Sequence, residues 1–493
     1  MKIRKILVLV YLLIQAINVY PQQFPKLIMP GDYPDPTILR DGKDYYMTHS
    51  PFYYAPGFLI WHSQDLINWE PITRAMPEYQ GSAMAPDLVK YKGRYYIYFP
   101  SGGTNWVIWS ENIKGPWSKP IDLKIKGIDP GHVIGEDGKR YLYVNEGKIV
   151  QLSDDGLAVM GEEKKMYGGW HYPKEWITEC ECLESPKLLF KDGYFYLTSA
   201  EGGTAGPATS HMAIVARSKS VFGPWENSPY NPLVHTYSDS DKWWSQGHGT
   251  IVDDINGNWW IVYHAYAKGY HTLGRQTLLA PIEWTSGGWP KIKADGQFIG
   301  SREVIKNGLK LSDEFDGQAL GLQWIFWKEN PSRLITIKQQ ILHVPAKGSS
   351  PADGRLMLVT PTDKNYETSV KIESLNGNTS GLILFYDEEA FAGVTSDGMN
   401  FTIYKTPQQK RTVKNPFGKR FWLKIHNNGN LCTFLASKDG NTWITLSENV
   451  DVSQMHHNNF HGFYALRTAL VSEGKGSGQF QHFIYRDRGP KEE

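Results

Sequence analysis

The chain has 493 residues, with 52 Lys and Arg against 51 Asp and Glu, and a formal net charge of +1. This length exceeds the size at which a single hydrophobic core usually stops growing, so two domains are expected. The balanced charge gives no indication of binding to nucleic acid or to an anionic membrane. Aromatic residues at 13%, together with 48 glycines and 29 prolines, indicate a folded, turn-rich, all-β protein.

The N-terminal segment has the pattern of a signal peptide. Lys2, Arg4 and Lys5 precede the apolar run ILVLVYLLIQAI, which ends at Ile17. A run of this length behind positive charges is typical of an export signal and is too short for a stable membrane span. We therefore expect residues 1–22 to be a signal peptide and the protein to be exported, either periplasmic or secreted.

Residues 23–305 contain one pattern that occurs five times. Each copy has a polar residue near Pro or Gly, a short apolar strand, a Gly-containing turn and a returning strand rich in aromatic residues. The copies begin at Pro34, Ala85, Asp129, Glu184 and Gly247. A repeated hairpin with further strand material between copies is typical of the blades of a β-propeller. The sequence therefore predicts a five-bladed propeller over residues 23–305.

The polar residues near the start of each copy are the candidate functional groups. They are Asp35, Asp87, Asp129, Glu184 and His248. In a propeller the innermost strands line a central channel, so equivalent positions at their starts form a ring around one mouth. Clustered carboxylates separate in pKa, and glycoside hydrolysis needs such a pair, an acid and a base. Turn capping and a calcium site are the alternatives, although no calcium-loop spacing is present.

Three cysteines lie beyond the expected signal peptide. They are Cys180, Cys182 and Cys432. A Cys-x-Cys pair with one distant cysteine matches no zinc spacing and no disulfide framework. We expect three incidental thiols.

After about residue 300 the pattern changes to strands of alternating apolar and polar residues. Examples are YETSVKI, SGLILFY, MNFTIYK and RFWLKIH. Period-two alternation with polar turns predicts a β-sandwich over residues 306–493.

Both halves of the chain resemble a known enzyme family. Residues 24–300 carry, in this order, the motifs YPDP, APDL, IDP, ESPKLLFKDGYFYL, EGGT, GHGTIV and LGRQTLLAPIEW. They resemble glycoside hydrolase family 43, whose five-bladed propeller enzymes include β-xylosidases, α-L-arabinofuranosidases and arabinanases. The second half, with GLILFYDEEAFAGV, resembles the concanavalin-A-like C-terminal domain of family 43 β-xylosidases.

The resemblance implies three catalytic residues. Asp35 would be the general base, Asp129 the carboxylate that orients the acid and raises its pKa, and Glu184 the general acid. Glu179 and Glu181 are rival acids in the stretch WITECECLE, but Glu184 alone stands at the repeat position.

The resemblance also implies residues that surround the substrate. Arg275 would hydrogen-bond the bound sugar, and His248 would be the central histidine near the channel. Phe52 would be an aromatic wall of the sugar site, and Asp87 would have a supporting role. In relatives a loop of the C-terminal domain closes one side of the pocket, and we expect Phe391 or its neighbours to do so here.

The implied function is that of an exported, inverting exo-glycosidase that removes terminal β-D-xylose or α-L-arabinofuranose from plant polysaccharide fragments. The stretch GSAMAPD has Met84 where many relatives have tryptophan, and the acid motif reads ESP where EGP is usual. An exo-hydrolase for another sugar, such as galactose, and a non-catalytic carbohydrate-binding propeller are therefore alternatives. The expected partner is an oligosaccharide, with no required cofactor, although the resemblance allows a structural calcium ion in the channel near His248.

Overall fold

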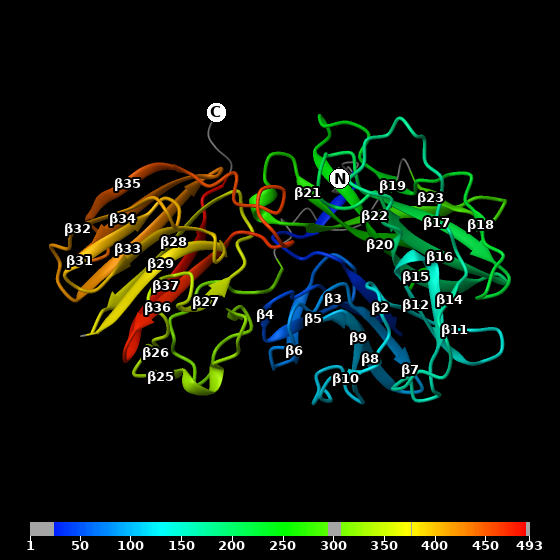
Figure 1. Ribbon diagram of the computed structural model, residues 1–493, viewed down its shortest axis with the longest axis horizontal. Helices are drawn as coiled ribbons and strands as arrows, with labels where there is room; N and C mark the ends of the chain where they lie inside the picture. Colours follow the sequence, from blue (N-terminus) through cyan, green and yellow to red (C-terminus); the bar gives the residue numbers. More distant parts are fainter. Residues whose placement is uncertain (1–23, 294–306, 376, 490–493) are drawn as a thin grey trace, which may run out of the picture.

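The computed structural model describes residues 24–293, 307–375 and 377–489. They form two β-structured domains that lie side by side, a propeller drawn in blue to green and a sandwich drawn in yellow-green to red (Figure 1). No helix in this part of the chain is long and apolar enough to cross a membrane. The expected signal peptide, residues 1–22, and the expected boundary near residue 305 lie outside the described residues.

Five antiparallel sheets form the blades of the propeller. Blade 1 consists of β2 (Thr37–Asp41), β3 (Asp44–Thr48), β5 (Gly57–Ser63) and β6 (Glu70–Met76), and blade 2 of β7 (Asp87–Tyr91), β8 (Arg94–Ser101), β9 (Thr104–Ser110) and β10 (Ile121–Asp122). Blade 3 consists of β11 (Gly131–Ile134), β12 (Arg140–Val144), β13 (Lys148–Gln151) and β14 (Lys164–Lys165). Blade 4 consists of β15 (Glu184–Lys191), β16 (Tyr194–Glu201), β17 (Met212–Ser218), β18 (Glu226–Asn227) and β19 (Val234–His235). Blade 5 consists of β20 (Trp243–Asp253), β21 (Trp259–Ala267), β22 (Gln276–Trp284), β23 (Pro290–Ile292) and β1 (Lys26–Met29).

The five innermost strands contact one another in a closed ring. Strand β2 contacts β7 and β20, β15 contacts β11 and β20, and β7 contacts β11. A cluster of buried apolar side chains lies between each pair of neighbouring blades. The N-terminal strand β1 pairs with β22 and completes blade 5 from the other end of the domain. The prediction of a five-bladed propeller is confirmed.

The inner hairpins close through tight turns that contain glycine, which accounts for the Gly-containing turn in the repeated sequence pattern. In blade 2 the turn residues Lys92 and Gly93 have φ values of 47° and 84°, and in blade 4 Asp192 and Gly193 have 50° and 79°. Two consecutive positive φ values belong to the type I′ turn, whose twist matches that of the flanking strands and favours glycine.

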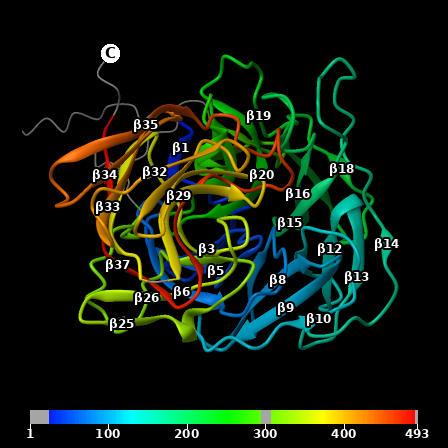
Figure 2. The same ribbon diagram turned by 60° about the vertical axis from the view of Figure 1, so that its left-hand side comes forward.

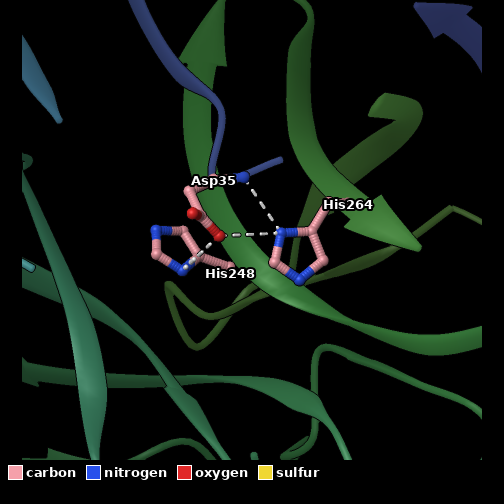
Figure 3. Close-up of side chains that lie close together, drawn as sticks. All are labelled: Asp35, His248 and His264. Carbon is pink, nitrogen blue, oxygen red and sulfur yellow. Dashed lines mark hydrogen bonds and ion pairs between the residues drawn. The ribbon is translucent and has the colours of Figure 1, made fainter. Parts of the chain in front are cut away.

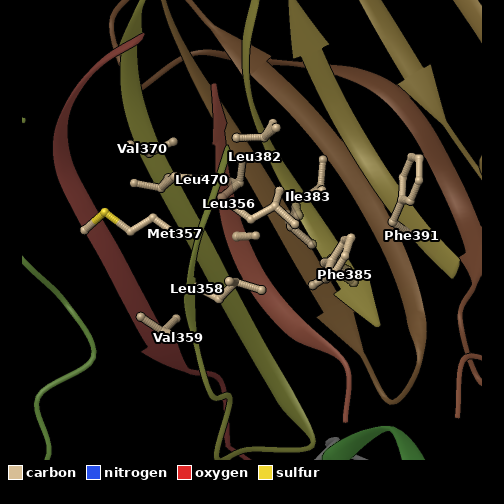
Figure 4. Packing of buried hydrophobic residues seen from close by; sticks show 14 of the residues in the cluster. Leu356, Met357, Leu358, Val359, Val370, Leu382, Ile383, Phe385, Phe391 and Leu470 are labelled. Carbon is tan, nitrogen blue, oxygen red and sulfur yellow. The ribbon is translucent and has the colours of Figure 1, made fainter. Parts of the chain in front are cut away.

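The C-terminal domain is a sandwich of two antiparallel sheets, as the alternating pattern predicted. The eight-stranded sheet has the order β32 (Lys410–Lys414), β31 (Asn400–Tyr404), β30 (Ala390–Ser396), β29 (Asn378–Asp387), β36 (Arg467–Gly474), β27 (Arg355–Val359), β24 (Ile325–Trp327), β4 (Tyr54–Ala55). The seven-stranded sheet has the order β25 (Thr336–Lys338), β26 (Ile341–Pro345), β37 (Ser477–Asp487), β28 (Asn365–Glu373), β33 (Arg420–Asn428), β34 (Leu431–Ser437), β35 (Trp443–Asp451). Figure 2 brings this domain forward. Its core lies between the sheets, with Leu382 and Leu470 on one side and Val370 on the other (Figure 4).

The two domains share a sheet. Strand β4 belongs to the propeller segment of the chain, yet it pairs with β24 of the sandwich through Tyr54 opposite Trp327 and Ala55 opposite Phe326. Phe52 and Tyr54 are 4% and 2% exposed and belong to the sandwich's hydrophobic cluster. The propeller therefore contributes an edge strand and aromatic side chains to the core of its neighbour.

The expectation of three free thiols is wrong for two of them. Cys180 and Cys182 form a disulfide in the loop that precedes β15, and Cys432 is free and buried. The expectation was based on known spacings of longer frameworks, and a bond across one intervening residue fits none of them.

Removal of residues 307–493 should leave a propeller of low solubility. Phe52, Tyr54 and strand β4 would then face water, and a large exposed apolar patch with an unpaired strand edge favours aggregation. Soluble yield and binding of a hydrophobic dye would measure the effect. A truncated propeller that stays monomeric and binds no dye would contradict this prediction.

Candidate active site

Polar residues from separate blades come together at one mouth of the channel. Asp35 precedes β2, Asp129 precedes β11, Glu184 begins β15 and His248 lies within β20. His248 Nδ1 is 3.5 Å from Asp35 Oδ1 and 3.8 Å from Asp129 Oδ2. Asp35, Asp129 and His248 are buried, and Glu184 is half-buried. The ring expected from the repeat positions is therefore present for these four residues.

The backbone is held in an unusual conformation at three members of this ring. Asp35, Asp129 and His248 have φ values of 56°, 57° and 55°. This left-handed region is uncommon for residues other than glycine and costs on the order of 1–3 kcal/mol each. Such a conformation persists only where the surrounding structure enforces it, and it is typical of functional sites.

The Asp35 carboxylate lies among donors that keep it charged. Its Oδ1 accepts a hydrogen bond from Arg275 Nη1 at 2.8 Å, and its Oδ2 accepts one from the Ser50 hydroxyl. Burial alone would raise the pKa of Asp35, but the Arg275 guanidinium holds it well below its usual range. Asp35 is therefore an ionised carboxylate that can accept a proton.

Two imidazoles flank this carboxylate. His264 Nδ1 lies 3.2 Å from Asp35 Oδ1 and accepts a hydrogen bond from the Asp35 backbone N–H at 3.0 Å (Figure 3). Burial lowers the pKa of His264 to about 4 and that of His248 well below its usual value. Both rings are therefore neutral near pH 7, and the positive charge beside Asp35 is that of Arg275.

The pKa values of Asp129 and Glu184 are shifted upward, opposite to that of Asp35. Burial and then the charge of Asp35 raise the pKa of Asp129 above its usual value. Burial, followed by the charges of Asp129 and Asp35, raises the pKa of Glu184 well above its usual value. Because the two groups repel each other when both are charged, a shared proton resides on Glu184. The site therefore holds a proton donor and a proton acceptor, as general acid–base catalysis requires.

The rival acids Glu179 and Glu181 lie in a different environment. Both are exposed. Glu179 Oε2 accepts a hydrogen bond from the Ala205 backbone N–H at 2.8 Å. Glu184 alone of the three is half-buried beside Asp129 and Asp35, which favours it as the donor.

Arg275 offers further donors beside the acid and base. Its Nε and Nη2 are buried and have no hydrogen-bond partner among the described residues, and the same holds for His248 Nε2 and Ser185 Oγ. The Phe52 ring lies 5.5 Å from the guanidinium carbon. Unsatisfied buried polar groups next to an aromatic ring are suited to hydrogen-bond a sugar.

The carboxylate oxygens of Asp87 are engaged by protein groups. Its Oδ1 is 3.0 Å from Lys187 Nζ, and its Oδ2 accepts a hydrogen bond from the His132 backbone N–H at 2.7 Å. Its Oδ1 also lies 3.5 Å from the Thr37 hydroxyl. These partners come from blades 4, 3 and 1, so Asp87 ties blades together and is not free to bind a sugar.

The expectation that Phe391 closes the pocket is wrong. It lies in β30, 2% exposed, with its ring 5.4 Å from that of Tyr404 and 6.4 Å from that of Phe385 (Figure 4). Every residue of β30 is buried, and Phe391 belongs to the hydrophobic cluster of the sandwich core.

Another loop of the sandwich, residues 454–464, reaches the propeller. The Phe463 ring lies 5.5 Å from the Arg275 guanidinium carbon, and His457 Nδ1 is 2.9 Å from the Tyr266 hydroxyl. Asn458 exchanges two hydrogen bonds with the backbone of Gly206. The sequence analysis missed these residues because the segment HHNNFHGF belongs to no repeat. It also missed Ser50 and His264, although His264 lies in the returning strand of the fifth copy.

Among the described residues, one group of side chains has the spacing to hold an ion. It consists of Asp35, His248 and His264. Calcium prefers roughly six to eight oxygen ligands, whereas this group offers one carboxylate and two imidazoles. The same carboxylate is paired with Arg275. These donors do not fit Ca²⁺, and the calcium ion expected near His248 stays a prediction.

Two sequence families match the chain. The model of glycosyl hydrolases family 43 matches residues 24–290, and that of the β-xylosidase C-terminal concanavalin A-like domain matches residues 312–486. In solved structures, the fold is similar to that of the GH43 protein BlXynB from Bacillus licheniformis, with a TM-score of 0.83 and 26% identity. That superposition covers 94% of this chain and 99% of the other.

Curated relatives are similar over the greater part of the chain. The non-reducing end alpha-L-arabinofuranosidase BoGH43B of Bacteroides ovatus is 32% identical over 365 residues, which cover 67% of this chain and 65% of that protein. A xylosidase/arabinosidase of Butyrivibrio fibrisolvens is 35% identical over 299 residues, 54% of this chain and 55% of that protein. The chain thus spans between 55% and 65% of the length of these relatives.

Replacement of Lys187 by Met should destabilise the propeller. The change leaves the buried Asp87 carboxylate without its cation, and breaking a buried ion pair in this way costs about 3–5 kcal/mol. Urea unfolding followed by circular dichroism would measure the free energy of unfolding. Lys291→Met, which breaks an exposed pair with Glu283, is the matched control and should leave the unfolding midpoint unchanged. Equal effects of the two substitutions would show that Asp87 does not tie the blades.

Proposed function

Because the chain belongs to glycosyl hydrolase family 43, we propose that it is an exo-glycosidase that removes terminal pentose residues, β-D-xylose or α-L-arabinofuranose, from plant polysaccharide fragments. Two of its relatives, a xylosidase/arabinosidase and an alpha-L-arabinofuranosidase, support this substrate class. The observation that carries the proposal is the opposed protonation of Asp35 and Glu184 at one mouth of the channel.

In the proposed reaction each carboxylate has one task. Asp35 takes a proton from a water molecule that attacks the anomeric carbon, and Glu184 gives its proton to the departing glycosidic oxygen. Asp129 keeps Glu184 protonated through its negative charge. Attack by water on the face opposite the leaving group inverts the anomeric configuration.

Arg275 and the aromatic residues beside it would bind the terminal sugar. The free Nε and Nη2 of Arg275 are donors for sugar hydroxyls, and Phe52 and Phe463 each lie 5.5 Å from its guanidinium. Loop 454–464 covers this side of the mouth, and a covered pocket favours removal of terminal sugars over attack within a chain. The chemistry proposed here needs no cofactor, because both proton transfers are made by side chains.

We propose that the protein acts outside the cytoplasm. The N-terminal sequence has the pattern of an export signal. The Cys180–Cys182 disulfide supports the same compartment, because disulfides persist in oxidising environments.

A non-catalytic sugar-binding propeller is the weaker alternative. Binding alone needs aromatic surfaces and hydrogen bonds, whereas this mouth also holds a carboxylate kept ionised by Arg275 and a second kept protonated. The purified protein should therefore turn over aryl β-xylosides or aryl α-L-arabinofuranosides. Release of another sugar, such as galactose, from a panel of aryl glycosides would favour the alternative of an exo-hydrolase for that sugar.

The rate losses caused by substituting the proposed acid and the proposed base should depend differently on the leaving group of the substrate. Glu184→Gln should lower the rate on natural oligosaccharides by about 10²–10⁴-fold, and much less on a dinitrophenyl glycoside, whose leaving group needs little protonation. Asp35→Asn should be severe on both substrates, because water must be deprotonated in either case. Steady-state kinetics would measure both effects. The same dependence on leaving group in the two variants would show that the roles are wrongly assigned.

The first sugar released should have the inverted anomeric configuration. NMR spectra recorded before mutarotation would identify it. If Asp35 acts through water, its carboxyl group should lie about 6.5–9.5 Å from that of Glu184 in a substrate complex. Retained configuration would instead indicate a nucleophile and would contradict the base assignment.

Asp129→Asn should shift the pH dependence of the reaction. The negative charge of Asp129 raises the pKa of Glu184, so its removal lowers that pKa, and the acid loses its proton at lower pH. The basic limb of the kcat/KM profile should therefore move to lower pH, while the acidic limb should stay where Asp35 sets it. An unmoved basic limb would show that Asp129 does not act on the acid.

A further inference from the structure

A buried ion pair crosses between the two domains directly behind the catalytic mouth. Arg467, the first residue of β36, donates from Nη1 and Nη2 to Asp32 Oδ2 at 3.2 and 3.1 Å. Asp32 and Arg467 are 5% and 4% exposed. Asp32 lies three residues before Asp35, so this contact joins the sandwich to the segment that carries the proposed base.

The other carboxylate oxygen of Asp32 accepts a hydrogen bond from Arg275, the residue whose side chain contacts the proposed base Asp35. Asp32 Oδ1 accepts a hydrogen bond from the Arg275 backbone N–H at 3.2 Å, and the Tyr33 N–H donates to the Arg275 carbonyl at 3.0 Å. The Arg275 side chain then reaches Asp35 Oδ1 at 2.8 Å. The contacts thus form one continuous series from Arg467 through Asp32 and Arg275 to Asp35.

The close approach of Asp32 to this backbone depends on a glycine. Gly274 precedes Arg275 and has a φ of 76°, and a Cβ atom there would lie 2.2 Å from Asp32 Oδ1. Any other residue would displace the carboxylate. The chain therefore provides space for Asp32 at the point where it fixes the Arg275 main chain.

We propose that Arg467 is a positioning residue for the catalytic base, which acts through Asp32 and the Arg275 backbone to hold the Arg275 guanidinium against Asp35. The sandwich would then set the geometry of the propeller's catalytic centre as well as cover its mouth. This proposal rests on the proposed function, in which Asp35 is the base.

The charges along the series give Arg467 a specific effect. Burial raises the pKa of Asp32, and the charges of Arg467 and Arg275 oppose that rise. Without Arg467, only Arg275 offsets the free-energy cost of burying the charged Asp32 carboxylate. Asp32 lowers that cost by taking a proton or by moving. Either response weakens the acceptor that holds the Arg275 N–H and lets the guanidinium shift away from Asp35.

A buried ion pair can also serve only to dock one domain on another, since such pairs are often replaceable by apolar side chains. The two roles differ in what they change. A docking role lowers the fraction of folded enzyme but leaves the ionisation of Asp35 as it was. A positioning role changes the pKa of Asp35, because its partner moves.

The test is the pH profile of Arg467→Met in the full-length protein. We expect kcat/KM to fall on the order of 10²-fold, equally on the dinitrophenyl glycoside and on natural oligosaccharides, because the defect is on the side of the base. We also expect the acidic limb to move to higher pH, because loss of Arg275 raises the pKa of Asp35. The groups around Asp35 that remain carry no positive charge near pH 7. They are His248, His264, His49, His211, Ser50, Asp129 and Glu184.

Arg355→Met is the matched control. Arg355 is 9% exposed and pairs with Glu329 within the sandwich. Its loss should lower stability without moving the acidic limb. Arg467→Lys, which keeps the charge but loses the two-nitrogen contact, should show a smaller shift of the limb than Arg467→Met and carries the test where the latter does not fold.

Each outcome decides for or against the positioning role. A fall in stability with an unmoved acidic limb in both Arg467 variants, as in Arg355→Met, would overturn it and leave a docking pair. A rate loss confined to poor leaving groups would also overturn it, because the defect would then lie with the acid. Asp35→Asn measured in parallel separates the two hypotheses, since full activity in that variant would remove the proposed base itself.

Discussion

The ion pair between Arg275 and Asp35 is the interaction on which the rest of the site depends. Burial and mutual repulsion favour the neutral form of every carboxyl group at this mouth. One guanidinium, 2.8 Å from Asp35, reverses that tendency for a single member. Burial raises the pKa of Asp129 and of Glu184, and the charge preserved on Asp35 adds to that rise. One cation therefore divides a group of similar residues into a proton acceptor and a proton donor.

This arrangement is possible because the propeller holds the residues of the site rigidly. Residues far apart in the sequence lie within 4 Å of one another, and three of them have left-handed backbones. The Asp87–Lys187 pair adds contacts among blades beneath the site. The sandwich contributes from outside through Arg467 and Phe463. Charged residues that look alike in the sequence therefore have different roles, since the Asp87–Lys187 pair holds blades together whereas Asp35 belongs to the proposed catalytic site.

The parts of the structure that repeat were predictable from the sequence. Five hairpin copies gave the number of blades, and the first polar residue of each copy led to Asp35, Asp129, Glu184 and His248. Contacts made once could not be found in this way. Arg467 and Asp32 are 435 residues apart, and an arginine in an alternating strand carries no sign of its partner. Phe391 was wrongly placed at the pocket because the resemblance implies a closing loop in the C-terminal domain but does not say which segment of this chain forms it.

The outer edge of blade 5 has a consequence for how the protein is made. Strand β1 pairs with β22, and Lys26 lies opposite Leu279. During synthesis the first strand therefore waits until nearly the whole propeller has left the ribosome before its partner exists. Contacts of such long sequence separation are slow to form, and the unfinished ring exposes strand edges meanwhile. A chain of this design gains from any factor, such as a chaperone, that keeps strand β1 from pairing with the wrong strand.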